Sequence, residues 1–182
     1  MKKILTWVGI ILASLAVVLF VVFKVMQSQT KKHSPEGKVA YVQGETKIDV
    51  FYNRPSVKGR KIVGGLLPYG EVWRTGANEA TTFTTNRDLL VAGKPLAAGK
   101  YTLWTIPNQS SWKVIFNKKQ YGWGVGFDRK ASRDPSADVL QVDIPAEPLE
   151  DNVEMFTISL DDSGNLALVL AWEKTKVSVP LQ

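Results

Sequence analysis

The chain has 182 residues, of which 45% are hydrophobic and 22% charged, which suits one globular domain with a short additional segment. It contains no cysteine, which excludes disulfides, thiolate metal sites, a cysteine nucleophile and a lipid-modified cysteine anchor. The single histidine, His33, falls in a polar stretch, so a Ser-His-Asp triad and a zinc site of ordinary composition are also excluded. We expect no metal and no cofactor.

The net charge of +6 is unevenly placed along the chain. Five lysines and no acidic residue lie in the first 33 positions: Lys2, Lys3, Lys24, Lys31 and Lys32. Of the 23 basic side chains, 18 therefore remain against 17 acidic ones in the rest of the chain. The high isoelectric point is therefore due to this first segment. The rest of the chain is nearly neutral, which argues against nucleic-acid binding.

An uncharged run of residues 4–23 begins with Ile4 and ends with Phe23. As a helix it would span about 30 Å, the thickness of the hydrocarbon core of a bilayer. The residues after it lack the small side chains of a signal-peptide cleavage site, so we predict a retained anchor rather than a cleaved signal. Residues 1–26 are then a transmembrane anchor with a short cytoplasmic tail, and residues 27–35 a juxtamembrane linker.

The orientation of this anchor does not follow from charge, because lysines flank the run on both sides. A short N-terminal tail before a large C-terminal domain favours a single-pass protein of the inner membrane with its domain in the periplasm. Gly9, Ala13 and Ala16 form a stripe of small residues that suits close approach of another helix. A membrane-protein partner, and membership of a membrane assembly, are therefore alternatives.

Short strand patterns and turn signals fill the chain after residue 35. Hairpins are predicted around Gly44-Glu45 and around residues 107–110, and residues 161–164 read as another turn. No helical period appears, and nothing repeats. The predicted fold for residues 36–182 is an all-β, antiparallel sandwich or jelly roll. The predicted strands are residues 39–43, 46–52, 80–85, 89–92, 100–106, 111–117, 137–144, 153–160, 165–172 and 176–180.

Residues 52–85 form a long stretch of polar and glycine residues that also carries apolar side chains, such as Ile62 and Leu67. Disordered segments lack such apolar content, so an ordered loop system is predicted. Several sequence segments here and further on resemble the DUF2911 family: YNRP at 52–55, KGR at 58–60, GGLLPYG at 64–70, VWRTGANEAT at 72–81, GKYTLWTIP at 99–107 and WKVIFN at 112–117.

The resemblance covers about residues 34–180, and the Trp-Arg-Thr-Gly-Ala-Asn-Glu segment is its most distinctive part. It implies an all-β domain outside the inner membrane, of the kind exported by Bacteroidetes-type bacteria, and it implies no particular activity. Members often carry a cleavable signal peptide. The long apolar run departs from that pattern and suggests a tethered version.

Arginine forks suit bidentate recognition of carboxylate or phosphate. Arg54, Arg60 and Arg74 therefore either converge on an anionic ligand group or pair with carboxylates and fasten the loop to the sheet. The carboxylates considered as partners are Glu71, Glu79 and Asp49.

Trp73 and Trp123 lie in glycine-rich segments and are candidates for stacking on a sugar ring, with Asn78 as a neighbouring polar group. Trp104, Trp112 and Trp172 fall in strand patterns and are predicted to lie in the core.

Glu79 is the candidate for acid–base chemistry, and its alternative is a structural glutamate in a salt bridge. Glycoside hydrolysis needs a second carboxylate about 5–10 Å away, for which Asp49, Glu71 and Asp128 are the candidates. Oxygen ligands at residues 161–165 suggest a calcium loop, but the stretch reads equally well as a turn and lacks the glutamate of an EF-hand. No metal site is therefore assigned.

The preferred interpretation is a membrane-tethered extracytoplasmic domain that binds an anionic or sugar-like envelope ligand or a partner, without catalysis. The alternatives are a glycan-directed hydrolase that uses Glu79, and a subunit of a membrane assembly.

Overall fold

The computed structural model describes residues 2–126 and 128–182, and the chain divides into two compact units between His33 and Ser34. The first unit is one helix, α1 (Lys2–His33). Its stretch Thr6–His33 is long and apolar enough to cross a membrane, and none of its apolar window is buried. A retained anchor and a signal sequence both have these properties. The helix runs on to His33, so most of the predicted linker is helical.

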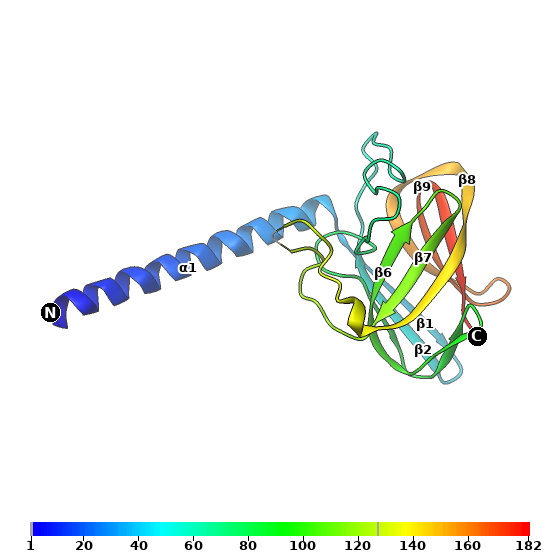
Figure 1. The fold of residues 1–182 in the computed structure, drawn as a ribbon, viewed down its shortest axis with the longest axis horizontal. Helices are drawn as coiled ribbons and strands as arrows, with labels where there is room; N and C mark the ends of the chain where they lie inside the picture. Colours follow the sequence, from blue (N-terminus) through cyan, green and yellow to red (C-terminus); the bar gives the residue numbers. More distant parts are fainter. Residues whose placement is uncertain (1, 127) are drawn as a thin grey trace. The chain divides into compact units, whose positions relative to one another are not determined.

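The second unit is built on antiparallel strands, as the sequence predicts (Figure 1). The strand order is β1-β2-β3-β6-β7-β8-β9, with a separate β4-β5 hairpin. The predicted hairpins after Gln43 and after Pro107 are both present. The strand bounds are β1 (Glu36–Gln43), β2 (Thr46–Asn53), β3 (Thr82–Thr85), β4 (Leu89–Val91), β5 (Lys94–Leu96), β6 (Gly99–Pro107), β7 (Ser111–Asn117), β8 (Asp138–Asp161) and β9 (Ala167–Pro180).

The last two strands are longer than the sequence pattern indicated. Residues 138–145 of β8 pair with β7, and the rest of β8 pairs with β9. In β9, Leu170 and Trp172 are buried before Glu173, and Val177 and Val179 after it. The buried positions therefore change from even to odd at Glu173, whose φ of 53° marks an irregularity in the strand. This change interrupts the two-residue period, so the sequence pattern of β9 predicted two strands, residues 165–172 and 176–180, where the structure has one.

The sheet curls so that the second half of β8 returns to the end of β2. The Tyr52 hydroxyl accepts a hydrogen bond from Ile158 N (3.0 Å) and lies 3.3 Å from Ile158 O, and Ser56 forms a bridge with Met155. The space enclosed in this way holds the main core. The sequence predicted one apolar helix followed in the chain by an all-β sandwich, and this is confirmed. The two layers of the sandwich belong to one curled sheet.

The residues between β2 and β3, 54–81, form the predicted ordered loop, hereafter the long loop. It lies at one end of the domain, and the β1–β2 turn lies at the other (Figure 1). Val57 and Trp73 pair with backbone groups of β8 and β6, and Glu173 accepts a hydrogen bond from Ile62 N (2.9 Å). Ile62 and Leu67 are buried in the core, whereas Leu66 and Tyr69 are exposed. The long loop is therefore held by both ladder bonds and apolar contacts.

Candidate functional site

The outer face of β6 and β7 carries a second, smaller apolar cluster. Because strand side chains alternate between faces, Leu103 and Val114 enter the main core while Trp104 and Ile115 point the other way. Both outward residues are nevertheless fully buried. They are covered by residues 118–126 and 128–134, hereafter the covering loop, whose Tyr121 ring meets Trp104 edge-on at 5.2 Å. The cluster therefore fixes the position of the covering loop.

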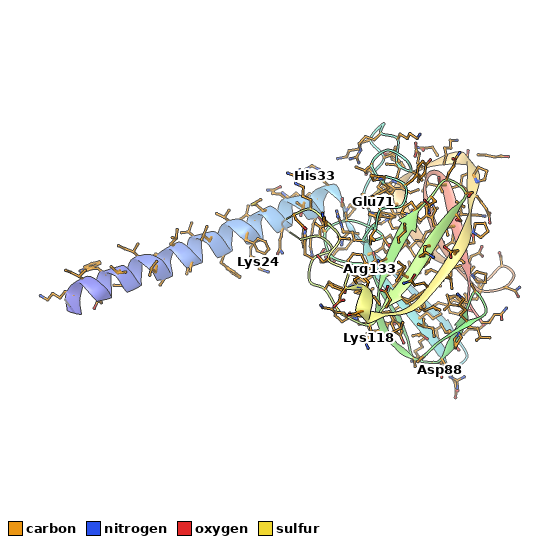
Figure 2. All side chains as sticks on the ribbon, in the orientation of Figure 1. Lys24, His33, Glu71, Asp88, Lys118 and Arg133 are labelled. Carbon is orange, nitrogen blue, oxygen red and sulfur yellow. The ribbon has the colours of Figure 1, made fainter. Side chains whose placement is uncertain are left out.

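A polar network around Asp138 holds the far end of the covering loop. Asn117 is buried and donates from Nδ2 to Asp134 O and to Asp138 Oδ1, both at 2.8 Å. Arg133 pairs with Asp138, with Nε 3.1 Å from Oδ1, and only 11% and 7% of these two side chains are exposed. Figure 2 shows Arg133 close to the short 3-10 helix Pro135–Ala137. The network fastens the C-terminal end of the covering loop to β7 and to the start of β8.

Burial by itself would raise the pKa of Asp138. Hydrogen bonds from Arg133, Asn117 and Gln141, together with the charge of Arg133, outweigh burial and hold the pKa below its ordinary value. Asp138 is therefore ionised at neutral pH, and its role is to anchor the covering loop.

An open hollow of about 490 Å³ lies between the covering loop and the outer face of β2, β3 and β6. Glu79 is its one carboxylate among the described lining residues, and Lys100 is its ammonium group. Asn53 donates from Nδ2 to Glu79 Oε2 (3.0 Å), and Gln120 donates to Lys100 O (3.1 Å). The lining residues are Phe51, Glu79, Ala80, Thr82, Lys100, Gln120, Tyr121 and Gly122.

Arg74 and Asn78 contact the covering loop at Gly124, which follows two residues after Gly122 in the lining of the hollow. Gly124 donates its backbone N–H to Asn78 O (2.9 Å), and a Cβ at Gly124 would stand 2.3 Å from Arg74 Cδ. Trp123, between Gly122 and Gly124, is half-buried. The structure thus brings Arg74, Asn78, Glu79 and Trp123 to one segment of the covering loop, and only Glu79 of these lines the hollow.

Trp73, a candidate for stacking on a sugar ring, is part of the core instead. It is 8% exposed, stacks on Trp172 at 5.5 Å and meets Phe156 at 4.8 Å. Its Nε1 donates to Gly76 O (3.0 Å). Three aromatic rings therefore surround the indole, and at 8% exposure Trp73 offers no platform to a sugar. Trp104, Trp112 and Trp172 are buried as predicted.

Arg54 and Arg60 donate to carbonyl and hydroxyl groups and not to Glu79. At the end of β2, Asn53 points toward Glu79. Arg54, the first residue of the long loop, points toward β8, where it donates to Phe156 O (3.3 Å) and Thr157 Oγ1 (3.1 Å). Arg60 donates to Val57 O and Ser56 O within its own loop.

Hydrogen bonds hold Arg54 and Arg60 in separate places, and the stem of Arg74 packs on the covering loop. In the described part of the chain none of the three forms an ion pair with a carboxylate, so the alternative of pairing with Glu71, Glu79 or Asp49 is not seen. Arg54 does fasten the long loop to the sheet, but it does so through the Phe156 carbonyl and the Thr157 hydroxyl of β8 and not through a carboxylate.

Asp49, Glu71 and Asp128, the proposed second carboxylates, do not line the hollow. Residues 161–164 form the turn between β8 and β9, where Ser163 N donates to Asp161 Oδ1 (3.0 Å). Among the described residues, no three His, Cys, Asp or Glu side chains gather as metal ligands would.

Sequence reasoning missed Phe51, Thr82, Lys100, Gln120 and Tyr121. The signal for Phe51 was its alternation with the core residues Val50 and Tyr52, which places it on the outer face.

A protein-family model, described as "Protein of unknown function (DUF2911)", matches residues 34–181, which is nearly the whole second unit. The chain belongs to the DUF2911 family. No curated protein and no solved structure matches it. The match begins at Ser34, where the second unit begins, so the DUF2911 domain includes the curled sheet, the hollow and the covering loop, while the helix lies outside it.

Proposed function

We propose that this DUF2911 protein is a membrane-tethered, extracytoplasmic binding domain, anchored by one helix in the inner membrane with its C-terminal domain in the periplasm. The hollow beside Glu79 is the observation that carries the binding role. Two partly buried aromatic residues, Phe51 and Tyr121, lie beside a carboxylate, an amide and an ammonium group. Aromatic faces combined with a few fixed polar groups suit a polyhydroxylated, sugar-like ligand.

Catalysis receives less support from the same hollow. Glycoside hydrolysis uses two carboxyl groups flanking one bond, and the described lining supplies one, Glu79. Glu79 also accepts a hydrogen bond from the buried Asn53, which suits a fixed acceptor of ligand hydroxyls. No specific observation favours the membrane-assembly alternative.

Replacing Glu79 with glutamine should weaken ligand binding by about 10- to 100-fold, because a hydrogen bond to a charged acceptor contributes about 1.5–3 kcal/mol. The full-length protein in detergent micelles is presented to an array of neutral and acidic envelope oligosaccharides, and affinities are then measured by calorimetry. Glu71→Gln is the matched control, because Glu71 is exposed on the long loop (Figure 2). Equal affinities for wild type and Glu79→Gln, or no retention of any oligosaccharide, would refute the binding role of the hollow.

The anchor has its own test. In a bacterial host the protein should remain in the membrane fraction after carbonate extraction, keep its first residues on N-terminal sequencing, and lose its domain to protease added to spheroplasts. A soluble product that begins after residue 26 would show a cleaved signal instead. Protection of the domain from protease in intact spheroplasts, with digestion after lysis, would show the opposite orientation.

A further inference from the structure

Arg74 is a half-buried cation for which the described residues supply no partner. Its Nε is buried without a hydrogen bond, and among the described residues its side chain forms no hydrogen bond and no ion pair. Arg54 and Arg60, by contrast, each donate to two acceptors. Charged groups removed from water are normally paired, because desolvation is costly, so an unpaired guanidinium in this position requires an explanation.

The backbone around Arg74 is also unusual. Thr75 and Asn78 have φ values of 55° and 56°, in the left-handed region, which is a genuine outlier for a β-branched threonine. Thr75 is fully buried and its carbonyl accepts from the Thr81 hydroxyl (2.6 Å), so the surrounding contacts maintain the conformation. Strained residues of this kind gather at ligand sites, where packing holds a group in place before the ligand arrives.

The backbone of Gly124 packs against the side chain of Arg74. The position that a Cβ would take at Gly124 is occupied by the aliphatic part of Arg74, at 2.3 Å from Cδ and 2.8 Å from Cβ. The arginine stem therefore packs directly on the backbone of the covering loop, which restricts its rotamers. Desolvation by this packing also lowers the pKa of Arg74 from its ordinary value, although an arginine remains charged.

We infer that Arg74 is a preorganised receptor for an oxyanion, a carboxylate or a phosphate group carried by the ligand of the neighbouring hollow. The terminal nitrogens of a guanidinium can donate two parallel hydrogen bonds to an oxyanion, which an ammonium group cannot do. Nε itself stays covered by the protein. The hollow and Arg74 share the segment from Tyr121 to Gly124. This inference rests on the proposed binding role of the hollow and narrows its ligand to an acidic saccharide, such as a uronate or a sugar phosphate.

The oxyanion site is tested first without any saccharide. The melting temperature of the full-length protein in detergent is followed as inorganic phosphate replaces chloride at constant ionic strength. The wild type should show a saturable rise of about 2 °C or more, because an anion bound only by the folded state stabilises it. Arg74→Met should abolish the rise. Arg60→Met is the matched control, because Arg60 is exposed and bonded within its own loop, and should keep it.

Arg74→Met gives a second readout in chloride alone. An unpaired, desolvated cation opposes folding, so its replacement by an apolar side chain of similar length should leave the melting temperature unchanged or raise it. A clear fall in melting temperature would show that the guanidinium is already satisfied in the free protein. A phosphate response that survives in Arg74→Met would place the anion elsewhere. Either result overturns the assignment.

The link to the hollow is tested with matched saccharides. Wild type should bind a uronate-containing or phosphorylated oligosaccharide at least tenfold more tightly than the neutral analogue, and Arg74→Met should lose this preference while keeping its affinity for the neutral one. The uronate and phosphate arms show which oxyanion is used. If Lys100→Met removes the preference and Arg74→Met does not, Lys100 is the receptor and the inference fails. If no saccharide binds but the phosphate response depends on Arg74, the proposed function fails and the oxyanion site stands.

Discussion

Replacing Trp73 with alanine is expected to lower the free energy of unfolding of the domain by about 3–5 kcal/mol, the cost of removing a large buried aromatic side chain. Trp73 is almost fully buried, stacks on Trp172 and makes edge contacts to Trp112 and Phe156. Such ring pairs each add about 0.5–1.5 kcal/mol beyond the area that they bury. The backbone of Trp73 also pairs with Thr105, and alanine would keep these two bonds, so the expected loss comes from the side chain alone.

The measurement is denaturant unfolding of the full-length protein in detergent, followed by fluorescence and circular dichroism. In thermal unfolding the same loss corresponds to a fall of roughly 6–20 °C for a domain of this size. Leu66→Ala is the control from the same loop: Leu66 is 44% exposed, so we expect a change within about 0.5 kcal/mol. If the two variants unfolded alike, Trp73 would not be the core residue described above.

Replacing Arg133 with methionine is expected to destabilise the domain by about 3–5 kcal/mol at neutral pH, because it leaves the buried Asp138 carboxylate without its cation. The carboxylate would keep only Asn117 and Gln141 as donors. The covering loop would then lose one of its attachments to β8, while the Asn117–Asp134 bond remains. Because this loop lines the hollow, ligand binding should weaken together with stability.

The loss of stability in Arg133→Met should depend on pH, because it depends on the charge of Asp138. In the wild type the pKa of Asp138 lies below its unfolded value of about 3.9, so its contribution is complete above that pH and is lost as the pH falls through the folded pKa. Without Arg133, burial raises the pKa of Asp138 in the folded state. A carboxyl group with a raised folded pKa favours folding only at low pH. The stability deficit of Arg133→Met should therefore be largest near pH 7 and shrink toward pH 4.

Chemical unfolding of both proteins between pH 4 and pH 8 measures this difference. Lys113→Met removes a comparable ion pair to Asp143, at 2.9 Å, but these side chains are 33% and 66% exposed. Exposed pairs contribute less than about 1 kcal/mol, so the control should change little at any pH. A deficit for Arg133→Met that stayed constant with pH would mean that Asp138 is not the group left unpaired.

The local sequence pattern predicted the elements whose signals lie within a few residues of each other. The apolar run predicted a helix because twenty successive uncharged residues leave no other favourable arrangement. The hairpins after Gln43 and Pro107 followed from turn residues between alternating strands. Burial of Trp104, Trp112 and Trp172 followed from the same alternation. The long loop was recognised as ordered, because it carries apolar side chains among its turn residues.

The tertiary structure alone decided which of these residues meet. Trp73 has the loop sequence of an exposed residue, yet the curl of the sheet places Trp172 and Phe156 around it. Arg54 and Arg74 lie in one segment of sequence, but the fold places them against different neighbours, β8 and the covering loop. Glu79 meets Lys100 and Tyr121 through pairings between strands far apart in the chain. Side-chain chemistry and short-range periods are written in the sequence, whereas the long-range strand register that assembles a site depends on the packing of the whole core.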